Sequence, residues 1–182
     1  KSTLLRVLMG LMRAEGREYR SSQDTTGSVA VEELTPSYVV IKATGTLAAK
    51  DGAKGFSYAC RLKAFAGLPR VEVQVSVANT MGPRCEDFVP LERLAWELPT
   101  AIQNPQVRIG GERQVLETSL TGDQTAWIYQ STSDAYELGG TLSGSGQGKS
   151  AKPLTTGWAS VSDAHRGLAA GVRGFWQMYP KS

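Results

Sequence analysis

The sequence predicts an all-β fold, an antiparallel β-sandwich that forms a single domain over residues 1–182. The first observation is the alternation of Val71, Val73, Val75 and Val77 with polar residues, which is the period of a strand with one face in solvent. The second is a series of short β-rich segments separated by Gly, Pro, Asn and Asp clusters, a pattern typical of sandwiches and barrels. The third is the length, because 182 residues suit one domain and bury a core without disulfide or metal support.

Four consecutive strands are predicted in the first half of the chain. Residues 29–34 and 38–47 form one pair, because both are rich in β-branched residues and a Thr-Pro-Ser turn separates them. Residues 56–64 and 70–78 form the next pair, with Gly-Leu-Pro between them. Residues 1–14 carry apolar residues at spacings that also suit an amphipathic helix, and the β-rich context favours a strand there.

Shorter strands are predicted farther along the chain. They cover residues 91–98, 114–117, 126–130, 157–161 and 168–178. The first of these, LERLAWEL, consists of good helix formers as well, and again the context favours a strand. The Gly/Ser-rich residues 139–150 and the shorter stretch 51–55 are predicted as loops.

Charge and hydropathy exclude several classes of partner. The chain carries 20 Lys+Arg and 17 Asp+Glu, a net charge of +3 with no basic run, so neither nucleic acid nor anionic lipid is expected. No apolar stretch approaches the roughly 20 residues that span a bilayer, so no membrane segment is expected. The chain begins with Lys1, and its first apolar run has no signal-peptide cleavage site. We therefore expect a processed chain or an excerpt from a larger multidomain protein.

Metal and cofactor motifs are also weak. The two cysteines, Cys60 and Cys85, exclude a four-cysteine zinc site, and two buried thiols are favoured over a single bridge between them. The stretch SGSGQGKS at residues 143–150 nearly spells a phosphate-binding loop. However, Ser143 replaces its first glycine and Pro153 stands where the following helix must run. No metal and no cofactor are expected.

His165 is the only histidine, and it follows Asp163 in a polar link between two predicted strands. An exposed turn histidine is expected there. The alternative is a small hydrolase in which His165 acts as the base with Asp163 or a nearby glutamate. A glycosidase would need two carboxylates facing one another across a sugar, and 17 acids make clusters common by chance. The acidic clusters are Glu32-Glu33, Glu86-Asp87, Glu92 and Glu97.

The closing stretch GLAAGVRGFWQMYP combines rings with planar hydrogen-bond donors. If it continues as a strand, Arg173, Phe175, Gln177 and Tyr179 share one face. Such a surface suits sugars, whose C–H faces lie on aromatic rings while their hydroxyls bind Arg and Gln side chains. The alternative is a strand whose rings pack on a neighbouring domain.

Three other tryptophans, Trp96, Trp127 and Trp158, are more often found in a core than on a ligand platform. Taken with the closing stretch, the sequence provides six candidate carbohydrate-binding residues. They are Arg173, Trp176, Gln177, Tyr179, Trp158 and His165.

The order of these segments resembles the exo-acting rhamnogalacturonan lyases of polysaccharide lyase family 26. The resemblance covers most of the chain, from about residue 16 to residue 180. It rests on residues 29–33, 38–45, 58–67, 71–79, 157–158 and 167–180. Its most specific piece is the closing GVRGFWQMYP, and no short catalytic signature of the family is placed on this sequence.

The resemblance implies a multidomain enzyme with an N-terminal β domain, a central β-sandwich and a large C-terminal α/α toroid that does much of the substrate binding. This chain is similar to the central sandwich. Such lyases abstract the C5 proton of a uronate and eliminate the 4-linked sugar, which needs a base and cations to stabilise the enolate-like charge. No toroid sequence lies in these 182 residues, so no catalytic residue carries over and a complete active site is not expected here.

We therefore expect a non-catalytic module of a pectin-degrading, lyase-like protein. It would organise neighbouring domains of the same polypeptide and add to a sugar-facing surface. An autonomous carbohydrate-binding module is the alternative, and the small hydrolase is a third hypothesis. The expected partners are a polysaccharide or oligosaccharide and the neighbouring domains. The expected location is extracellular or periplasmic, because pectin is too large to enter a cell intact.

Overall fold

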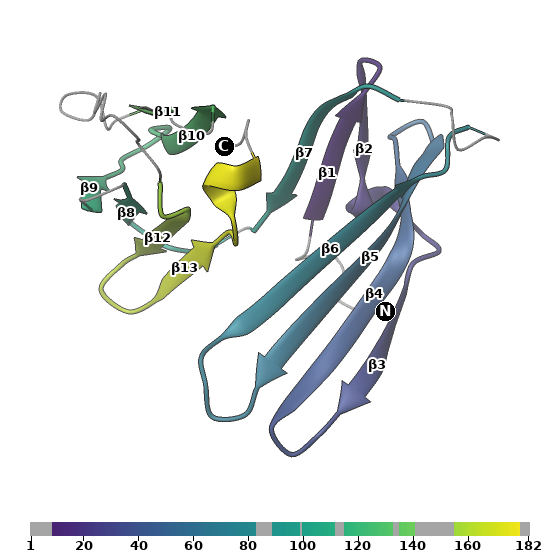
Figure 1. Cartoon of the computed structure of the whole chain (residues 1–182), viewed down its shortest axis with the longest axis horizontal. Coiled ribbons are helices and arrows are strands. Elements are labelled where there is room, and N and C mark those ends of the chain that lie inside the picture. The colour runs from purple at the N-terminus through teal and green to yellow at the C-terminus, as the bar shows by residue number, and fades with distance from the viewer. Residues whose placement is uncertain are drawn as a thin grey trace. The chain divides into compact units, whose positions relative to one another are not determined.

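The computed structural model describes residues 9–82, 89–98, 100–111, 115–132, 135–140 and 155–178. These residues form antiparallel sheets and two short 3₁₀ helices, so the predicted all-β antiparallel class is confirmed (Figure 1). No helix among them is long and apolar enough to cross a membrane. The chain separates into two compact units, residues 1–99 (unit 1) and 100–182 (unit 2), which are described one at a time. The single domain over 1–182 stays a prediction.

Four long strands dominate unit 1. They are β3 (Ser28–Leu34), β4 (Tyr38–Ala48), β5 (Lys54–Phe65) and β6 (Val71–Asn79). They pair in the order β6-β5-β4, with β3 on the other side of β4. The two predicted strand pairs are therefore confirmed, although Lys54 and Gly55 begin β5 instead of ending the predicted loop at 51–55.

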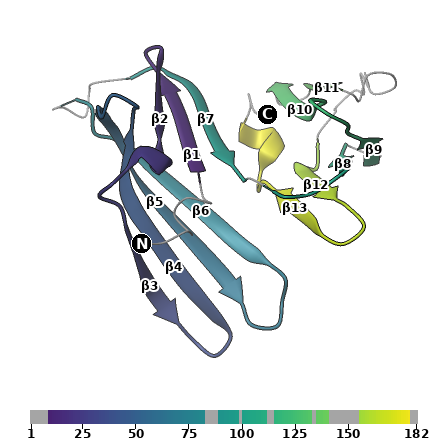
Figure 2. The same ribbon diagram turned by 180° about the vertical axis from the view of Figure 1, so that it is seen from behind.

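Three shorter strands complete the sheet of unit 1. They are β1 (Met9–Ala14), β2 (Arg17–Arg20) and β7 (Leu91–Glu97). They pair in the order β2-β1-β7 and join β4 through one pair, Arg20 opposite Ala48. The strands favoured for residues 9–14 and 91–97 are confirmed, while residues 1–8 lie outside the described residues. At this narrow joint the sheet curls into a half-barrel, and Figure 2 shows it from behind.

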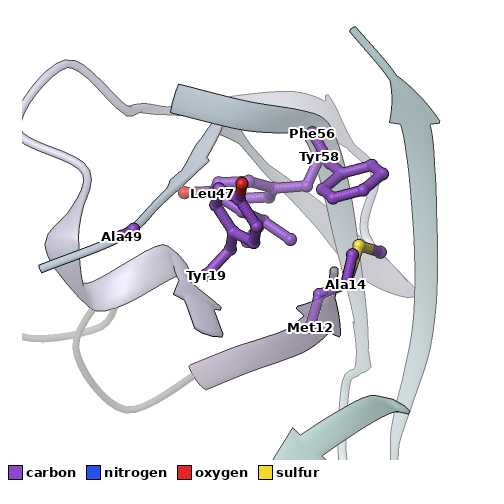
Figure 3. Close-up of a cluster of buried hydrophobic side chains, with 7 residues drawn as sticks. All are labelled: Met12, Ala14, Tyr19, Leu47, Ala49, Phe56 and Tyr58. Carbon is purple, nitrogen blue, oxygen red and sulfur yellow. The ribbon is translucent and has the colours of Figure 1, made fainter. Parts of the chain in front are cut away.

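The core of unit 1 lies inside this curl. Figure 3 shows side chains of β1 and β2 facing those of β4 and β5. The rings of Tyr19 and Phe56 meet edge to face, with centroids 5.7 Å apart and planes at 85°. The buried cluster comprises Met12, Ala14, Tyr19, Leu47, Ala49, Phe56 and Tyr58. Removing this apolar surface from water is what holds the two parts of the sheet together.

Asp24 fastens the connection between β2 and β3 to β4. Its Oδ1 accepts hydrogen bonds from the amide and hydroxyl of Thr26, both at 2.8 Å, and its Oδ2 accepts one from the amide of Thr46 at 2.8 Å. Burial raises the pKa of the Asp24 carboxyl, but these hydrogen bonds outweigh it and the net pKa is lowered. Burial, followed by the charge of Asp24, raises the pKa of Tyr58 to about 12. The Tyr58 hydroxyl has no hydrogen-bond partner among the described residues.

Unit 2 contains a four-stranded sheet and a separate hairpin. The sheet has the order β13-β12-β8-β9 and the hairpin pairs β10 with β11. The bounds are β8 (Gln106–Gly110), β9 (Val115–Ser119), β10 (Ala126–Thr132), β11 (Ala135–Gly140), β12 (Trp158–Ser162) and β13 (Gly167–Gly171). The strands predicted near 114–117, 126–130 and 157–161 are confirmed, whereas β8 and β11 were not predicted. Gly139 and Gly140, predicted as loop, end β11, and residues 141–150 lie outside the described residues.

The strand predicted over residues 168–178 is wrong beyond Gly171. β13 ends at Gly171, a turn with Gly174 at φ 64° follows, and residues Phe175–Met178 form the 3₁₀ helix η2. Phe175 is only 6% exposed and its Cβ lies over Gly157, where a Cβ on the glycine would come within 2.3 Å. Burial of this ring and a left-handed glycine turn therefore override the alternating pattern.

We predict that Asp24→Ala destabilises the fold by about 1–3 kcal/mol at pH 7, because three hydrogen bonds are lost from a half-buried site. The folded pKa of Asp24 lies below its ordinary value of 3.8, so its stabilisation is complete above pH 3.8 and is lost as the pH falls through the folded pKa. Urea unfolding at pH 7 and at pH 2–3 measures this difference. The exposed Asp123→Ala serves as the control, and a wild-type to Asp24→Ala gap that does not shrink in acid contradicts the prediction.

Candidate functional site

The most distinctive surface of unit 1 is one face of the four long strands. Opposed residues in antiparallel strands share a face, and the register produces three cross-strand rows of four residues each. Not one member carries a charge or a hydroxyl. We call this grid the aliphatic face. Its rows are Leu34-Val39-Ala64-Val71, Val31-Ile41-Leu62-Val73 and Val29-Ala43-Cys60-Val75.

The aliphatic face is open to solvent at its outer strands. Leu34 is 76% exposed, Val31 61% and Val71 56%, whereas Ala43 and Cys60 on the inner strands are buried between their neighbours. Monomeric soluble proteins rarely expose contiguous apolar patches above a few hundred Å². The valine strand was expected to have one solvent face, and the structure leaves its valine side exposed as well.

A β-bulge keeps acidic side chains off this face. The register of β3 against β4 shifts between Val31 and Glu33, so Leu34 returns to the aliphatic side opposite Val39. Without the extra residue, the strand period would place Glu33 among the aliphatic side chains. The bulge therefore preserves an uncharged surface three rows long.

The opposite face of the same strands is held by charges. Glu32 accepts two hydrogen bonds from Arg61, at 2.6 and 3.0 Å, and its carboxylate lies 3.2 Å from Nζ of Lys42. The hydrogen bond from Arg61 is the main reason that the pKa of Glu32 is lowered. Nζ of Lys63 lies 3.7 Å from the centroid of the Tyr38 ring, a cation–π contact. Over the three rows of the aliphatic face, the sheet thus has apolar side chains on one side and mainly charged or polar side chains on the other, where Val40 is buried among them.

The aliphatic face continues the lining of the half-barrel core. Phe56 and Tyr58 of the core lie on the same side of β5 as Cys60 and Leu62, because residues two apart share a face. β4 and β5 have 11 and 12 residues, whereas β1, β2 and β7 have only 6, 4 and 7. In both ribbon views the shorter strands lie at one end of the long ones, and the end with the turns after β3 and β5 extends beyond them. One end of a continuous inner face is therefore covered by the core contacts of β1 and β2.

The residues predicted to bind carbohydrate do not share one strand face. Arg173 is exposed in the turn before η2, and Gln177 is exposed within η2. Trp176 also lies in η2, and Tyr179 lies outside the described residues. Trp158 is half-buried in β12, where its indole nitrogen lies against Gly110.

His165 is exposed in the turn between β12 and β13. Oδ1 of Asp163 accepts hydrogen bonds from the backbone amides of His165 at 2.8 Å and Arg166 at 2.9 Å, and Oδ2 accepts one from the amide of Gln103 at 3.2 Å. These bonds, that from His165 first, lower the pKa of Asp163. The contact is made by the His165 backbone, so this aspartate organises the turn and is not the orienting partner of an imidazole base.

The described residues of the predicted acidic clusters each have hydrogen-bond or ion-pair partners. Glu92 accepts a hydrogen bond from the amide of Gly16 at 2.6 Å, and Glu97 pairs with Arg20 at 3.1 Å. Glu86, Asp87 and Cys85 lie outside the described residues. Cys60 is a free, buried thiol whose pKa is raised by burial. Within the described ranges, no three His, Cys, Asp or Glu side chains come together as a metal site.

A second candidate surface lies on the β10–β11 hairpin of unit 2. Trp127 opposes Gly139 and Tyr129 opposes Glu137, so these four residues share one face. Trp127 is 42% exposed although a core position was favoured for it, and Glu137 is exposed. A Cβ on Gly139 would come within 2.0–2.7 Å of the indole ring, so only glycine lets the ring lie on the backbone of β11. The other side of the same hairpin carries the fully buried Gln130.

Comparison with family models, with curated proteins and with solved structures finds no match to this chain.

The sequence contains a signal for the aliphatic face. The alternation of β3 to β6 already places valine, leucine and isoleucine on one side of four adjacent strands. The pattern does not show whether another layer of the protein covers these side chains. The sequence gives a weaker signal for the Trp127 surface. Trp127 and Tyr129 are two residues apart and share a strand face, but the glycine opposite Trp127 can be identified only once the strand register is known.

We predict that the aliphatic face binds a hydrophobic dye such as ANS in the isolated chain. Val31→Lys combined with Val71→Lys lowers the dye fluorescence and changes the unfolding free energy by no more than about 0.5 kcal/mol, because both side chains are exposed. Gln74→Lys, on the polar face of β6 between Val73 and Val75, is the matched control and leaves the fluorescence unchanged. A large loss of stability in the double variant would mean that this face is covered within the chain.

Proposed function

We propose that this chain is a non-catalytic β module of a rhamnogalacturonan lyase-like protein, and that it organises neighbouring domains of the same polypeptide. The observation that carries the structural role is the aliphatic face, a sheet surface without polar groups that faces solvent at Leu34, Val31 and Val71. An exposed patch of this kind marks an interaction site. The lyase assignment rests on the ordered sequence resemblance.

The distribution of charge supports a scaffold role. Several described carboxylates are bound by arginine, lysine or backbone amides, as at Glu32, Glu97 and Asp163. Elimination next to a uronate requires a base together with cations that converge on one developing charge. In the module proposed here, those groups come from the neighbouring domain.

We predict that the isolated chain, incubated with rhamnogalacturonan I, produces no rise in the ultraviolet absorbance of unsaturated products. The complete gene product does produce it, because it supplies the base and cations that the elimination needs. A rise with the isolated chain refutes the non-catalytic role. If the complete gene product does not cleave, or if the gene encodes these 182 residues alone, the lyase-module proposal fails.

Carbohydrate binding is the second candidate function, and the Trp127 surface favours it. The indole of Trp127 is fixed against Gly139 with much of its surface in solvent, which is the arrangement that supports the C–H face of a pyranose. The carboxylate of Glu137 on the same face is an acceptor for sugar hydroxyls. Its negative charge favours a neutral sugar over a uronate. This function would move the sugar surface from the 168–179 stretch to the β10–β11 hairpin.

We predict that Trp127→Ala weakens binding of neutral pectic oligosaccharides about tenfold or more in titration calorimetry, because the stacking platform is lost. Trp158→Phe, which alters a half-buried ring in β12, leaves the affinity nearly unchanged, as does Arg173→Ala. Loss of affinity in Arg173→Ala with no effect of Trp127→Ala would return the site to the closing stretch. No heat of binding for the unaltered chain would refute this second function.

A further inference from the structure

The chemistry, size and position of the aliphatic face indicate which kind of partner covers it. This inference rests on the structural role proposed above. We propose that it is the inner face of a half-complete β-sandwich. The missing layer is a β-sheet with alternating aliphatic residues, carried by the same polypeptide outside this chain. Leu47 and Phe56 lie in the completed half, and Ile41 and Leu62 lie in the open half.

The inner face of β4 and β5 is continuous from the core to the aliphatic face. β4 and β5 carry buried residues against β1 and β2 at one end, and the same side of the same strands carries the aliphatic face at the other end. The existing cover is itself a sheet. Sheets in a sandwich stack about 10 Å apart with strands nearly aligned, so a second sheet segment continues this layer at the same spacing.

The half-barrel also remains open along β7. Leu94 opposes the core residue Met12 and is therefore on the inner side, yet it is 58% exposed. Leu91, opposite Ala14, is exposed in the same way. The inner surface thus presents further apolar side chains where the β1–β7 layer ends, so the missing layer can pack against both parts of the sheet.

The chemistry of the face restricts the partner. All twelve grid positions are Val, Leu, Ile, Ala or Cys, and the bulge after Val31 turns Glu32 and Glu33 to the polar side. A charged or strongly polar surface placed here would lose its hydration without gaining any hydrogen bond. The partner surface is therefore aliphatic and uncharged, as the inner face of a sandwich layer is.

The size of the face favours a covalently linked partner over a second copy. Four strands about 4.8 Å apart and three rows about 6.8 Å apart give a footprint of about 400 Å². Two copies stacked face to face would bury about 800 Å² in total, below the roughly 1,000 Å² expected of a specific interface between separate chains. The same area lies within the range of about 600–1,500 Å² found between domains of one chain, where the linkage supplies a high effective concentration.

Site-specific thiol labelling tests this proposal without depending on stability. Val31→Cys and Val71→Cys are placed on the aliphatic face and Gln74→Cys on the polar face of β6. Maleimide modification at each site is followed by peptide mass spectrometry, in the isolated chain and in the complete gene product. We expect the two aliphatic-face sites to react at least about tenfold more slowly in the complete gene product, a population shift equivalent to about 1.4 kcal/mol, while Gln74→Cys reacts at the same rate in both.

Equal rates in the two proteins would overturn the inference. Protection that appears in the isolated chain as its concentration rises would also overturn it, because a second copy would then be the cover. A photoreactive side chain at position 71 identifies the covering segment, and capture of a segment with helical periodicity would refute the sheet layer. Equal rates in a complete gene product that cleaves rhamnogalacturonan I would refute only this inference, whereas protection without cleavage would refute only the lyase assignment.

Discussion

The structure of unit 1 depends on the register of four strands. Opposed residues share a face, so a slip of one position would carry Lys42, Arg61 and Lys63 onto the aliphatic side. The Glu32 carboxylate opposes this slip, because it joins Arg61 of β5 and Lys42 of β4 from the bulged strand β3. Each exposed ion pair contributes little energy alone, about 0–1 kcal/mol. These ion pairs form in only one strand register, and that register places the twelve apolar residues on a single face.

This constraint explains how the sheet keeps an exposed apolar surface without burying it within unit 1. The long strands are stabilised at one end by the core around Tyr19 and Phe56, and along their length by pairing on both sides of β4 and β5. The edge strands carry charged residues, such as Glu72 on β6, which discourage pairing with another chain at the sheet edge. The open face therefore favours association by stacking, with side chains, over association by extension of the sheet.

Local alternation was sufficient to predict β3 to β6, because each strand is long and its partner is the next segment along the chain. It was insufficient for β1 with β7, where Met9 pairs with Glu97 across most of unit 1 and no local pattern encodes the pairing. The prediction of a strand after Gly171 failed for a different reason. Its alternation of Arg173, Phe175 and Gln177 suits a strand, but the buried ring of Phe175 and the left-handed Gly174 produce a turn and a 3₁₀ helix. Alternation identifies the residues that share a strand face, but it does not show whether another layer covers that face. For this reason Val71 and Trp127 were both expected to be buried, although both are exposed.

The two candidate surfaces need opposite solvent conditions, and this is the strongest reason to assign them different tasks. Removal of water from the aliphatic face around Ile41 and Leu62 lowers the free energy, so this face suits permanent contact with another apolar surface. The hairpin surface combines the Trp127 ring with the charged Glu137, whose carboxylate would lose its hydration in such a contact. It suits a ligand that arrives through water and offers hydroxyl groups. Both requirements are met if the aliphatic face of unit 1 contacts a neighbouring domain and the hairpin surface of unit 2 faces solvent. The opposite assignment would bury the charge of Glu137 and leave the aliphatic face exposed to water.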